Sequence, residues 1–247
     1  TPFTNTFGNG QVGLVVLLFL IIYWFNLSRF SNFFLIVLGF KISFSAFFLA
    51  FIFFKRFKSF IFFSIFYLVC FALCVYLSKA YDPYEIFQVA ISPLSSVLAG
   101  ENVSNFDFEG HFNLRYIFKL FNINEYYFVA TIILYLIGIV GIFFIKDLTI
   151  LFLYLCNLTL IIFYHWIYDF VFLIPLAAYI LKDRPKNIFF DIPNCFMIFF
   201  VFYFFRINQL IFNNFFDEIL LNLIGFVLLL YSTFSLIYLD KINKILK

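Results

Sequence analysis

The sequence predicts an all-α polytopic membrane protein, a multi-helix bundle with broken, V-shaped helix pairs and an outer loop that carries short amphipathic helices. Hydrophobic residues make up 65% of the 247 residues, charged residues make up only 12%, and 46 residues are phenylalanine. This composition is far from that of a soluble domain. Apolar runs long enough to cross a hydrocarbon core of roughly 30 Å recur along the whole chain. They leave no room for a soluble domain, so we expect residues 1–247 to form a single transmembrane domain.

The first two apolar runs differ in whether a charge interrupts them. Residues 11–26 form an uninterrupted span that ends before Arg29. The next run, "SNFFLIVLGFKISFSAFFLAFIFFKRFK", carries Lys41 near its middle, where a lysine is costly unless it reaches water or a partner. This run either crosses once with Lys41 buried, or rises as a half-helix to Lys41, turns, and descends to the basic cluster at its end.

Charge counting favours the broken pair. The segment 59–78 leads into a long polar loop, residues 80–126, in which acidic residues outnumber basic ones. The positive-inside rule places this loop outside the membrane. Within it, residues 82–99 and 111–121 have the pattern of short amphipathic helices that lie on a membrane surface. A broken pair then gathers eleven of the sixteen basic residues on the cytoplasmic face, namely Arg29, Lys55, Arg56, Lys58, Lys146, Lys182, Arg184, Lys186, Lys241, Lys244 and Lys247.

A second long run is interrupted in the same way. About thirty-five residues lie between Lys146 and Lys182, which is too many for one comfortable span, and "HWIYD" stands in their middle. We expect this run to rise, turn at "HWIYD" and return. Two later spans, residues 188–205 and 216–238, leave the C-terminus in the cytoplasm.

Four polar segments meet at the outer face in this topology. They are "GNGQ" at residues 8–11, Lys41, the outer loop with Arg115, and "HWIYD". Polar groups that gather at the edge of an otherwise apolar bundle are typical of an intramembrane binding site. The sequence therefore predicts a site at the outer end of the bundle.

The order of these segments resembles that of a known family. The segments are "GNGQ" ahead of an apolar helix, "LIVLGFKISFSAFFLAFIFFKRFKSF", "GHFNLRYIFKLF" and "YHWIYDFVFLIPLAAYIL". They are similar to the C-terminal portion of the C-type-fold membrane glycosyltransferases of family 87, the polyprenyl-phosphate-sugar-dependent mannosyl- and arabinosyltransferases, over residues 8–181. Gly13 stands where the family commonly has asparagine, and Ile42 and Ser43 stand where it commonly has a proline.

The resemblance implies both an activity and a missing part. It implies sugar transfer from a polyprenyl-phosphate donor to a lipid or glycan acceptor at the outer face of a bacterial inner membrane. It also implies a catalytic carboxylate in a first outer loop, upstream of Thr1. Because the chain opens on Thr1 and its only methionine is Met197, we expect an N-terminally truncated fragment that is inactive by itself.

The candidate binding residues follow from the chemistry of such a donor. Cleavage of the glycosidic bond leaves negative charge on the phosphate, which cations and aligned hydrogen-bond donors stabilise. Lys41, Arg115 and His165 are the candidates for this role. Asp169 lies four residues after His165, where on a helical turn it would hold the imidazole in one tautomer. Gln11 is a candidate for hydrogen bonding to the sugar or the phosphate.

Each candidate also has a purely structural interpretation. Lys41 can be a lysine that snorkels from a helix end to water. Arg115 can pair with Glu109 or with lipid phosphate. His165 can cap a helix at the membrane interface, and Gln11 can belong to a helix-entry turn that its own backbone satisfies.

Other chemistry is not indicated by the sequence. The four cysteines lie in apolar runs without a histidine or acidic residue at metal-ligand spacing, so neither a metal site nor a cofactor is expected. The net charge of +3 is small and is divided between the membrane sides, which gives no reason to expect nucleic acid as a partner. No acidic residue of the outer loop is assigned as the general base.

The main alternative is a structural or proton-path membrane subunit of an organellar respiratory complex. The run "LIGIVGIFFIKDLTILFLYLCNL" has a superficial likeness to a small quinone-oxidoreductase membrane subunit. Such a subunit needs an acidic residue inside the span, where this chain has Cys156 and Asn157. A secondary transporter is a further alternative, although the internal repeat typical of transporters is not found.

Overall fold

Every regular element in the part of the chain that the structure describes is a helix. The structure is a computed structural model, and it describes residues 13–27, 30–39, 42–78, 84, 114, 117–118, 121–162, 167–182, 187–211 and 215–245. The helices are α2 (Gly13–Trp24), η1 (Ser31–Gly39), α3 (Ile42–Lys55), α4 (Phe57–Ser78), η3 (Asn124–Tyr126), α7 (Tyr127–Phe144), α8 (Leu148–Ile162), η4 (Ile167–Leu173), α9 (Ile174–Leu181), α10 (Ile188–Ile211) and α11 (Phe215–Ile245). The prediction of an all-α chain is confirmed for these residues.

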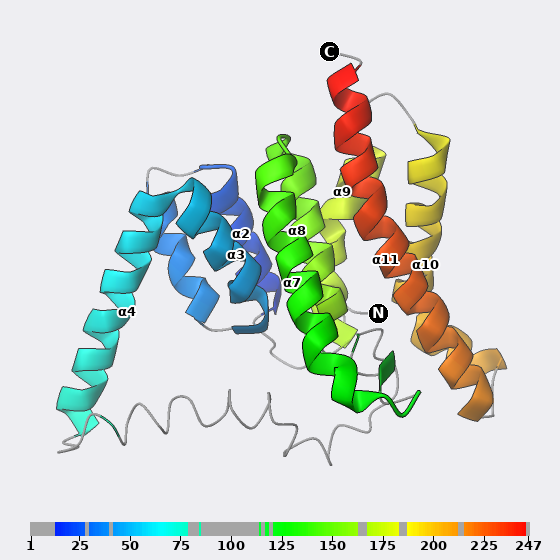
Figure 1. Ribbon diagram of the computed structural model, residues 1–247, viewed down its shortest axis with the longest axis horizontal. Helices are drawn as coiled ribbons and strands as arrows, with labels where there is room; N and C mark the ends of the chain where they lie inside the picture. Colours follow the sequence, from blue (N-terminus) through cyan, green and yellow to red (C-terminus); the bar gives the residue numbers. More distant parts are fainter. Residues whose placement is uncertain are drawn as a thin grey trace.

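Three of the described helices are long and apolar enough to cross a membrane. They are α4, α7 and α11, with apolar stretches at Phe57–Leu77, Tyr127–Phe144 and Asn222–Ile242. Shorter apolar helices, such as α2 and α8, complete a bundle in which the helix ends gather at two opposite levels (Figure 1). The α4 helix packs against α3 and η1 at the edge of this bundle. Length and composition therefore support a membrane location.

Each of the two interrupted runs is divided into separate elements near its polar interruption. η1 ends at Gly39 and α3 begins at Ile42, and the two pack against each other. Likewise α8 ends at Ile162, η4 begins at Ile167, and these two also pack together. The V shape of each pair stays a prediction, because residues 40–41 and 163–166 lie outside the described residues. Most of the predicted outer loop, residues 80–126, also lies outside them.

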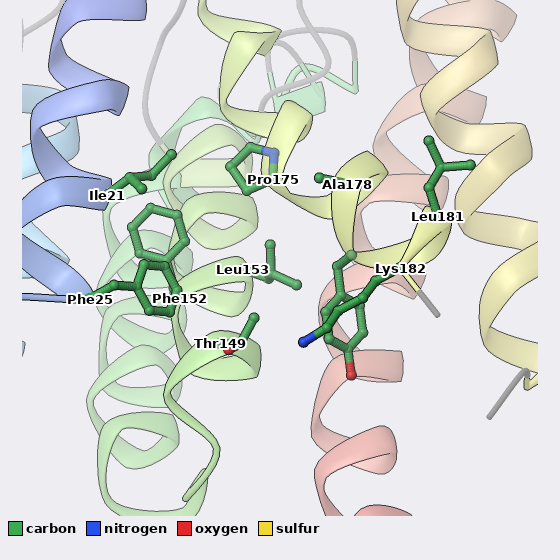
Figure 2. A pocket seen from close by; sticks show the side chains of 10 residues that line it. Ile21, Phe25, Thr149, Phe152, Leu153, Pro175, Ala178, Leu181 and Lys182 are labelled. Atoms are coloured by element: carbon green, nitrogen blue, oxygen red, sulfur yellow. The ribbon is translucent and has the colours of Figure 1, made fainter. Parts of the chain in front are cut away.

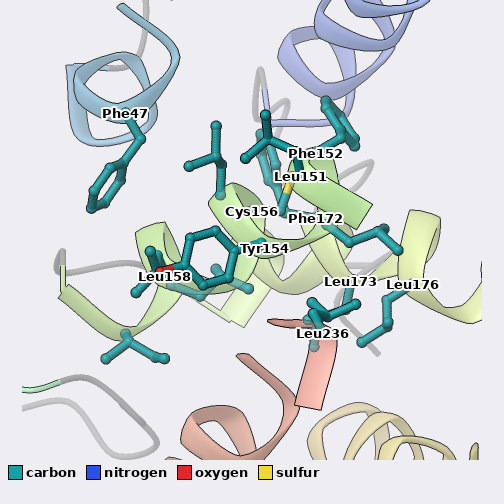
Figure 3. Close-up of a cluster of buried hydrophobic side chains, with 14 of the residues drawn as sticks. Phe47, Leu151, Phe152, Tyr154, Cys156, Leu158, Phe172, Leu173, Leu176 and Leu236 are labelled. Carbon is teal, nitrogen blue, oxygen red and sulfur yellow. The ribbon is translucent and has the colours of Figure 1, made fainter. Parts of the chain in front are cut away.

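The centre of the bundle is α8. All of its residues from Ile150 to Ile162 are buried, and it packs against α3, α7, η4 and α11. Figure 3 shows Tyr154 and Leu158 of α8 among side chains from α3, η4, α9 and α11. A helix that is apolar on all sides is stable only when neighbours or lipid surround it, and here the neighbours are protein.

A helix cap and an aromatic cluster fix the end of α2. Asn26 has a left-handed φ of 52°, its N–H donates to the Tyr23 carbonyl, and the Leu27 N–H donates to the Ile22 carbonyl. This is the Schellman pattern that ends many helices. Beside it, the Trp24 ring stacks on Phe51 at 4.0 Å between centroids. The α2 helix is therefore joined to α3 where it ends.

Two glycines let α7 approach its neighbours closely. A Cβ on Gly138 would overlap the ring of Phe47 in α3, and a Cβ on Gly141 would overlap the ring of Tyr154 in α8. Small residues at such contacts let helix backbones come together in a membrane, where van der Waals packing is a main source of association. The Tyr154 hydroxyl also donates to the Ile137 carbonyl at 3.1 Å.

Buried polar side chains join α8, α10 and α11. The Asn157 amide of α8 donates to the Ser232 hydroxyl of α11 at 2.7 Å. The Asn194 amide of α10 donates to the Phe190 carbonyl at 2.7 Å and to the Ser235 hydroxyl at 3.3 Å. Hydrogen bonds of this kind hold membrane helices together.

Replacing Asn157 by leucine is expected to lower the free energy of unfolding by about 1 kcal/mol, because it removes the hydrogen bond between α8 and α11. A double-mutant cycle with Ser232→Ala, measured by denaturation in mixed micelles, checks this. The matched control is Thr159→Val, because the Thr159 hydroxyl bonds the Leu155 carbonyl within α8. Coupling of Ser232 to Thr159 as strong as its coupling to Asn157 would contradict the prediction.

Candidate functional site

The residues that the sequence predicts for the site fall almost entirely outside the described part of the chain. Gln11, Lys41, Arg115 and His165 lie outside the described residues. Asp169 lies in η4, but its side chain is outside what the structure describes. The structure therefore places the elements next to these residues and tests no contact between their side chains.

The elements next to three of the predicted residues end at the same level of the bundle. The beginning of α2, the junction between η1 and α3, and the junction between α8 and η4 all lie at the lower end in Figure 1. These elements are also neighbours, because α2 packs against both η1 and η4, and α3 packs against α8. The described residues that flank positions 11, 41 and 165 are therefore brought to one end of the bundle.

Part of the outer loop is packed against the same end. Leu114 and Ile117 are buried, with 6% and 8% of their surface exposed, and belong to the main apolar core. The Phe118 ring contacts the ring of Tyr127, at 6.3 Å between centroids, and the Tyr127 hydroxyl donates to the Ile162 carbonyl at 3.4 Å. This contact joins the loop to the beginning of α7 and the end of α8. This contact was not predictable from the sequence, because nothing there distinguishes Tyr127 from the other fifteen of the sixteen tyrosines.

The opposite end of the bundle carries the described basic residues of the predicted cytoplasmic face. Lys55, Arg56 and Lys58 stand where α3 meets α4, and Lys146 stands between α7 and α8. Lys182 follows α9, and Lys241 lies near the end of α11. All of these helix ends lie at the upper end in Figure 1.

Two carboxylates at this basic end accept hydrogen bonds from backbone N–H groups. The Asp147 carboxylate accepts hydrogen bonds from the Thr149 and Ile150 N–H groups, at 2.8 and 3.1 Å, and so caps the start of α8. The Asp147 N–H donates to the Asp240 carboxylate of α11 at 3.1 Å. These bonds tie the turn between α7 and α8 to the end of α11.

A cavity of about 550 Å³ opens near the basic end, between α2, α8 and α9. Figure 2 shows Phe25 and Phe152 on one side of it and Lys182 on the opposite side. Thr149 contributes a hydroxyl, and most of the other lining residues are apolar. Such a cavity suits an apolar chain. It lies away from the end where the sequence predicts the donor site.

The described residues offer no metal centre. In the part that the structure describes, no three histidine, cysteine or acidic side chains are close enough to hold a metal ion.

The described residues define the class of protein, which is an all-helical protein with helices long and apolar enough to span a membrane. Comparison with protein-family models, with curated proteins and with solved structures gives no significant match.

Proposed function

We propose that this chain is the donor-binding part of a membrane glycosyltransferase, which transfers a sugar from a polyprenyl-phosphate donor to a lipid or glycan acceptor. One observation supports the proposal above the others. The described residues that flank Gln11, Lys41 and His165 come to one end of the bundle from three separate parts of the chain. A site at the end of a membrane bundle is where a lipid-linked phosphate is accessible, because the phosphate stays at the membrane surface.

The proposed roles follow from the charge that develops on the donor. Lys41 and Arg115 bind the donor phosphate and stabilise its negative charge as the sugar leaves. His165, oriented by Asp169, donates a further hydrogen bond to the phosphate. Gln11 binds the phosphate or the sugar. None of these five residues is the general base, and the catalytic carboxylate is supplied by a part of the full-length protein outside residues 1–247.

The proposed location is a bacterial inner membrane, with the end that carries the donor site facing outward and the lipid bilayer as a constant partner. The V-shaped pairs belong to this proposal, because each turn brings a polar residue to the outer surface. The described basic residues of the predicted cytoplasmic face support the orientation. They lie at the opposite end of the bundle, and lysine and arginine are enriched on the cytoplasmic side of membrane proteins.

Replacing Lys41 by glutamine is expected to lower the rate of sugar transfer about 100-fold, the size of effect seen when a single charge-stabilising group is removed. The measurement uses the full-length protein as its gene encodes it, in membranes, with a radiolabelled polyprenyl-phosphate sugar. Lys58→Gln is the matched control, because Lys58 lies at the basic end of the bundle. It should transfer sugar at the unaltered rate.

Two results would contradict the proposed function. The first is an unaltered full-length protein that transfers no sugar from mannosyl or arabinosyl donors. The second is an equal rate of sugar transfer for Lys41→Gln and Lys58→Gln.

No observation in the described residues favours the alternative function, a membrane subunit of a respiratory complex. Asn157, which stands where a proton path needs an acidic side chain, is buried and bonded to Ser232.

A further inference from the structure

A second cavity, of about 370 Å³, lies at the basic end of the bundle between the α3–α4 junction and the α7–α8 turn. Its polar lining comes from Lys55, Arg56 and Lys146, and its floor from buried residues such as Phe51 and Ile142. Three cationic side chains thus surround one small space. It is separate from the proposed donor site, which lies at the other end.

Arg56 is held in position by the fold. Its guanidinium donates to the Trp24 carbonyl at 2.9 Å and to the Tyr23 carbonyl at 3.2 Å, the last carbonyls of α2. The guanidinium carbon also lies 5.1 Å from the Tyr23 ring centre and 5.6 Å from that of Phe51. These contacts use two of the five N–H groups of an arginine. Arg56 is therefore a cation with a fixed position at the edge of the cavity, and its remaining N–H groups are not used by these two hydrogen bonds.

The lysine charges in this cavity are not balanced by the described carboxylates. No ion pair is found for Lys55 or Lys146 within the described residues, and Lys55 lies over the Phe143 ring at 5.2 Å. The carboxylate closest in sequence, Asp147, accepts backbone N–H groups at the start of α8. A cavity lined by three cations and no acidic side chain attracts an anion, and phosphate is an anion that both arginine and lysine bind well.

The surface beside the cavity is apolar and exposed. Phe143 and Phe144 of α7 are 51% and 72% exposed, and Phe53 and Phe54 of α3 are each 44% exposed. The Phe54 and Phe143 rings contact each other, at 5.1 Å between centroids, and so join the two helices beside the cavity. A free phosphate would make no contact with this apolar surface, whereas the acyl chains of a lipid would pack along it.

We propose that the cavity formed by Lys55, Arg56 and Lys146 binds the phosphate headgroup of an anionic membrane lipid, whose acyl chains lie along the exposed phenylalanines of α3 and α7. Basic cavities between helices at the cytoplasmic side of a membrane are suited to such headgroups. The bound lipid would bridge the α3–α4 junction and the α7–α8 turn, two parts of the chain about ninety residues apart.

The test measures binding of spin-labelled phosphatidylglycerol to the full-length protein in phosphatidylcholine nanodiscs. The double variant Lys55→Gln, Lys146→Gln should bind this lipid about 20-fold more weakly, since each lysine near a membrane surface contributes appreciably to anionic lipid affinity. The matched control is Lys58→Gln, Lys241→Gln. It removes two lysines from the same end of the bundle but outside the cavity, and should leave the affinity unchanged.

Further measurements separate the possible outcomes. Lys55→Arg, Lys146→Arg keeps both charges and should retain binding. If the double glutamine variant does not elute as a folded species, each single variant is measured instead, with an expected loss of about 5-fold. An equal loss in the control pair would show attraction to the whole basic end and overturn the proposal. Full displacement of the labelled lipid by millimolar inorganic phosphate would assign the cavity to a soluble anion and overturn the lipid assignment.

Discussion

Trp24→Ala is expected to lower the free energy of unfolding by about 3–5 kcal/mol, the usual cost of removing a large buried aromatic side chain. Only 1% of the Trp24 surface is exposed. Its ring contacts Phe51, Phe48 and Phe152, and its indole N–H donates to the Leu148 carbonyl at 2.9 Å. The substitution therefore removes both packing and a hydrogen bond where α2, α3 and α8 meet.

The measurement is the loss of the monodisperse elution peak after heating the detergent-purified protein. Trp24→Phe keeps most of the ring packing and loses the hydrogen bond, so it should cost about 1 kcal/mol. The matched control is Leu18→Ala on the same helix, because Leu18 is 53% exposed and should tolerate truncation. Equal destabilisation by Trp24→Ala and Leu18→Ala would show that the cluster around Trp24 does not hold α2 in place.

Gly141→Leu is expected to lower the free energy of unfolding by about 3 kcal/mol, at the upper end of the usual cost of overpacking. Even a single methyl group at this position would overlap the buried ring of Tyr154, so a leucine forces α7 away from α8. Gly141→Ala should cost less, because only the tyrosine ring has to move. The decrease is measured as a lower midpoint of thermal unfolding in detergent.

Two variants make this second prediction specific. Val140→Leu adds apolar volume next to Gly141, but Val140 is 51% exposed, so its stability should stay unchanged. Gly141→Ala combined with Tyr154→Leu exchanges volume across the α7–α8 contact and should recover part of the stability lost by Gly141→Ala. A double variant whose losses simply add would mean that the two residues do not contact each other.

The helices were predictable where apolar runs end at charged or polar residues. The runs at 59–78 and 188–205 correspond to α4 and to most of α10, and the last span continues in α11 to Ile245. Polar interruptions marked the break between η1 and α3, around Lys41, and the break between α8 and η4, at "HWIYD". This works because the cost of burying a charge or a polar backbone group in lipid is much larger than the difference between helix propensities.

The arrangement of the helices was not predictable in the same way. The α8 run and the α4 run are both apolar on every side, yet α8 is buried and α4 is largely exposed. Lipid is as apolar as leucine, so apolar character alone does not tell which helix is central. The close contacts of α7 with α3 and α8 depend on Gly138 and Gly141, and the hydrogen bond between α8 and α11 depends on Asn157. The side chains of the predicted donor site lie outside the described residues, so their roles stay predictions.

The burial of α8 also sets the order in which this bundle can be completed during synthesis. Its neighbours in α2 and α3 precede it in the chain, but the α11 residues that cover it, including Ser232 and Leu236, follow it by about seventy residues. At about 5–20 residues per second, this interval is on the order of ten seconds or less. Until α11 is made, the Asn157 amide lacks its serine partner, and the side of α8 that α11 covers is not packed against protein. The contacts around α8 are therefore completed only when α11 is present, and a ribosome stalled before α11 would leave a partly assembled intermediate with an unsatisfied amide.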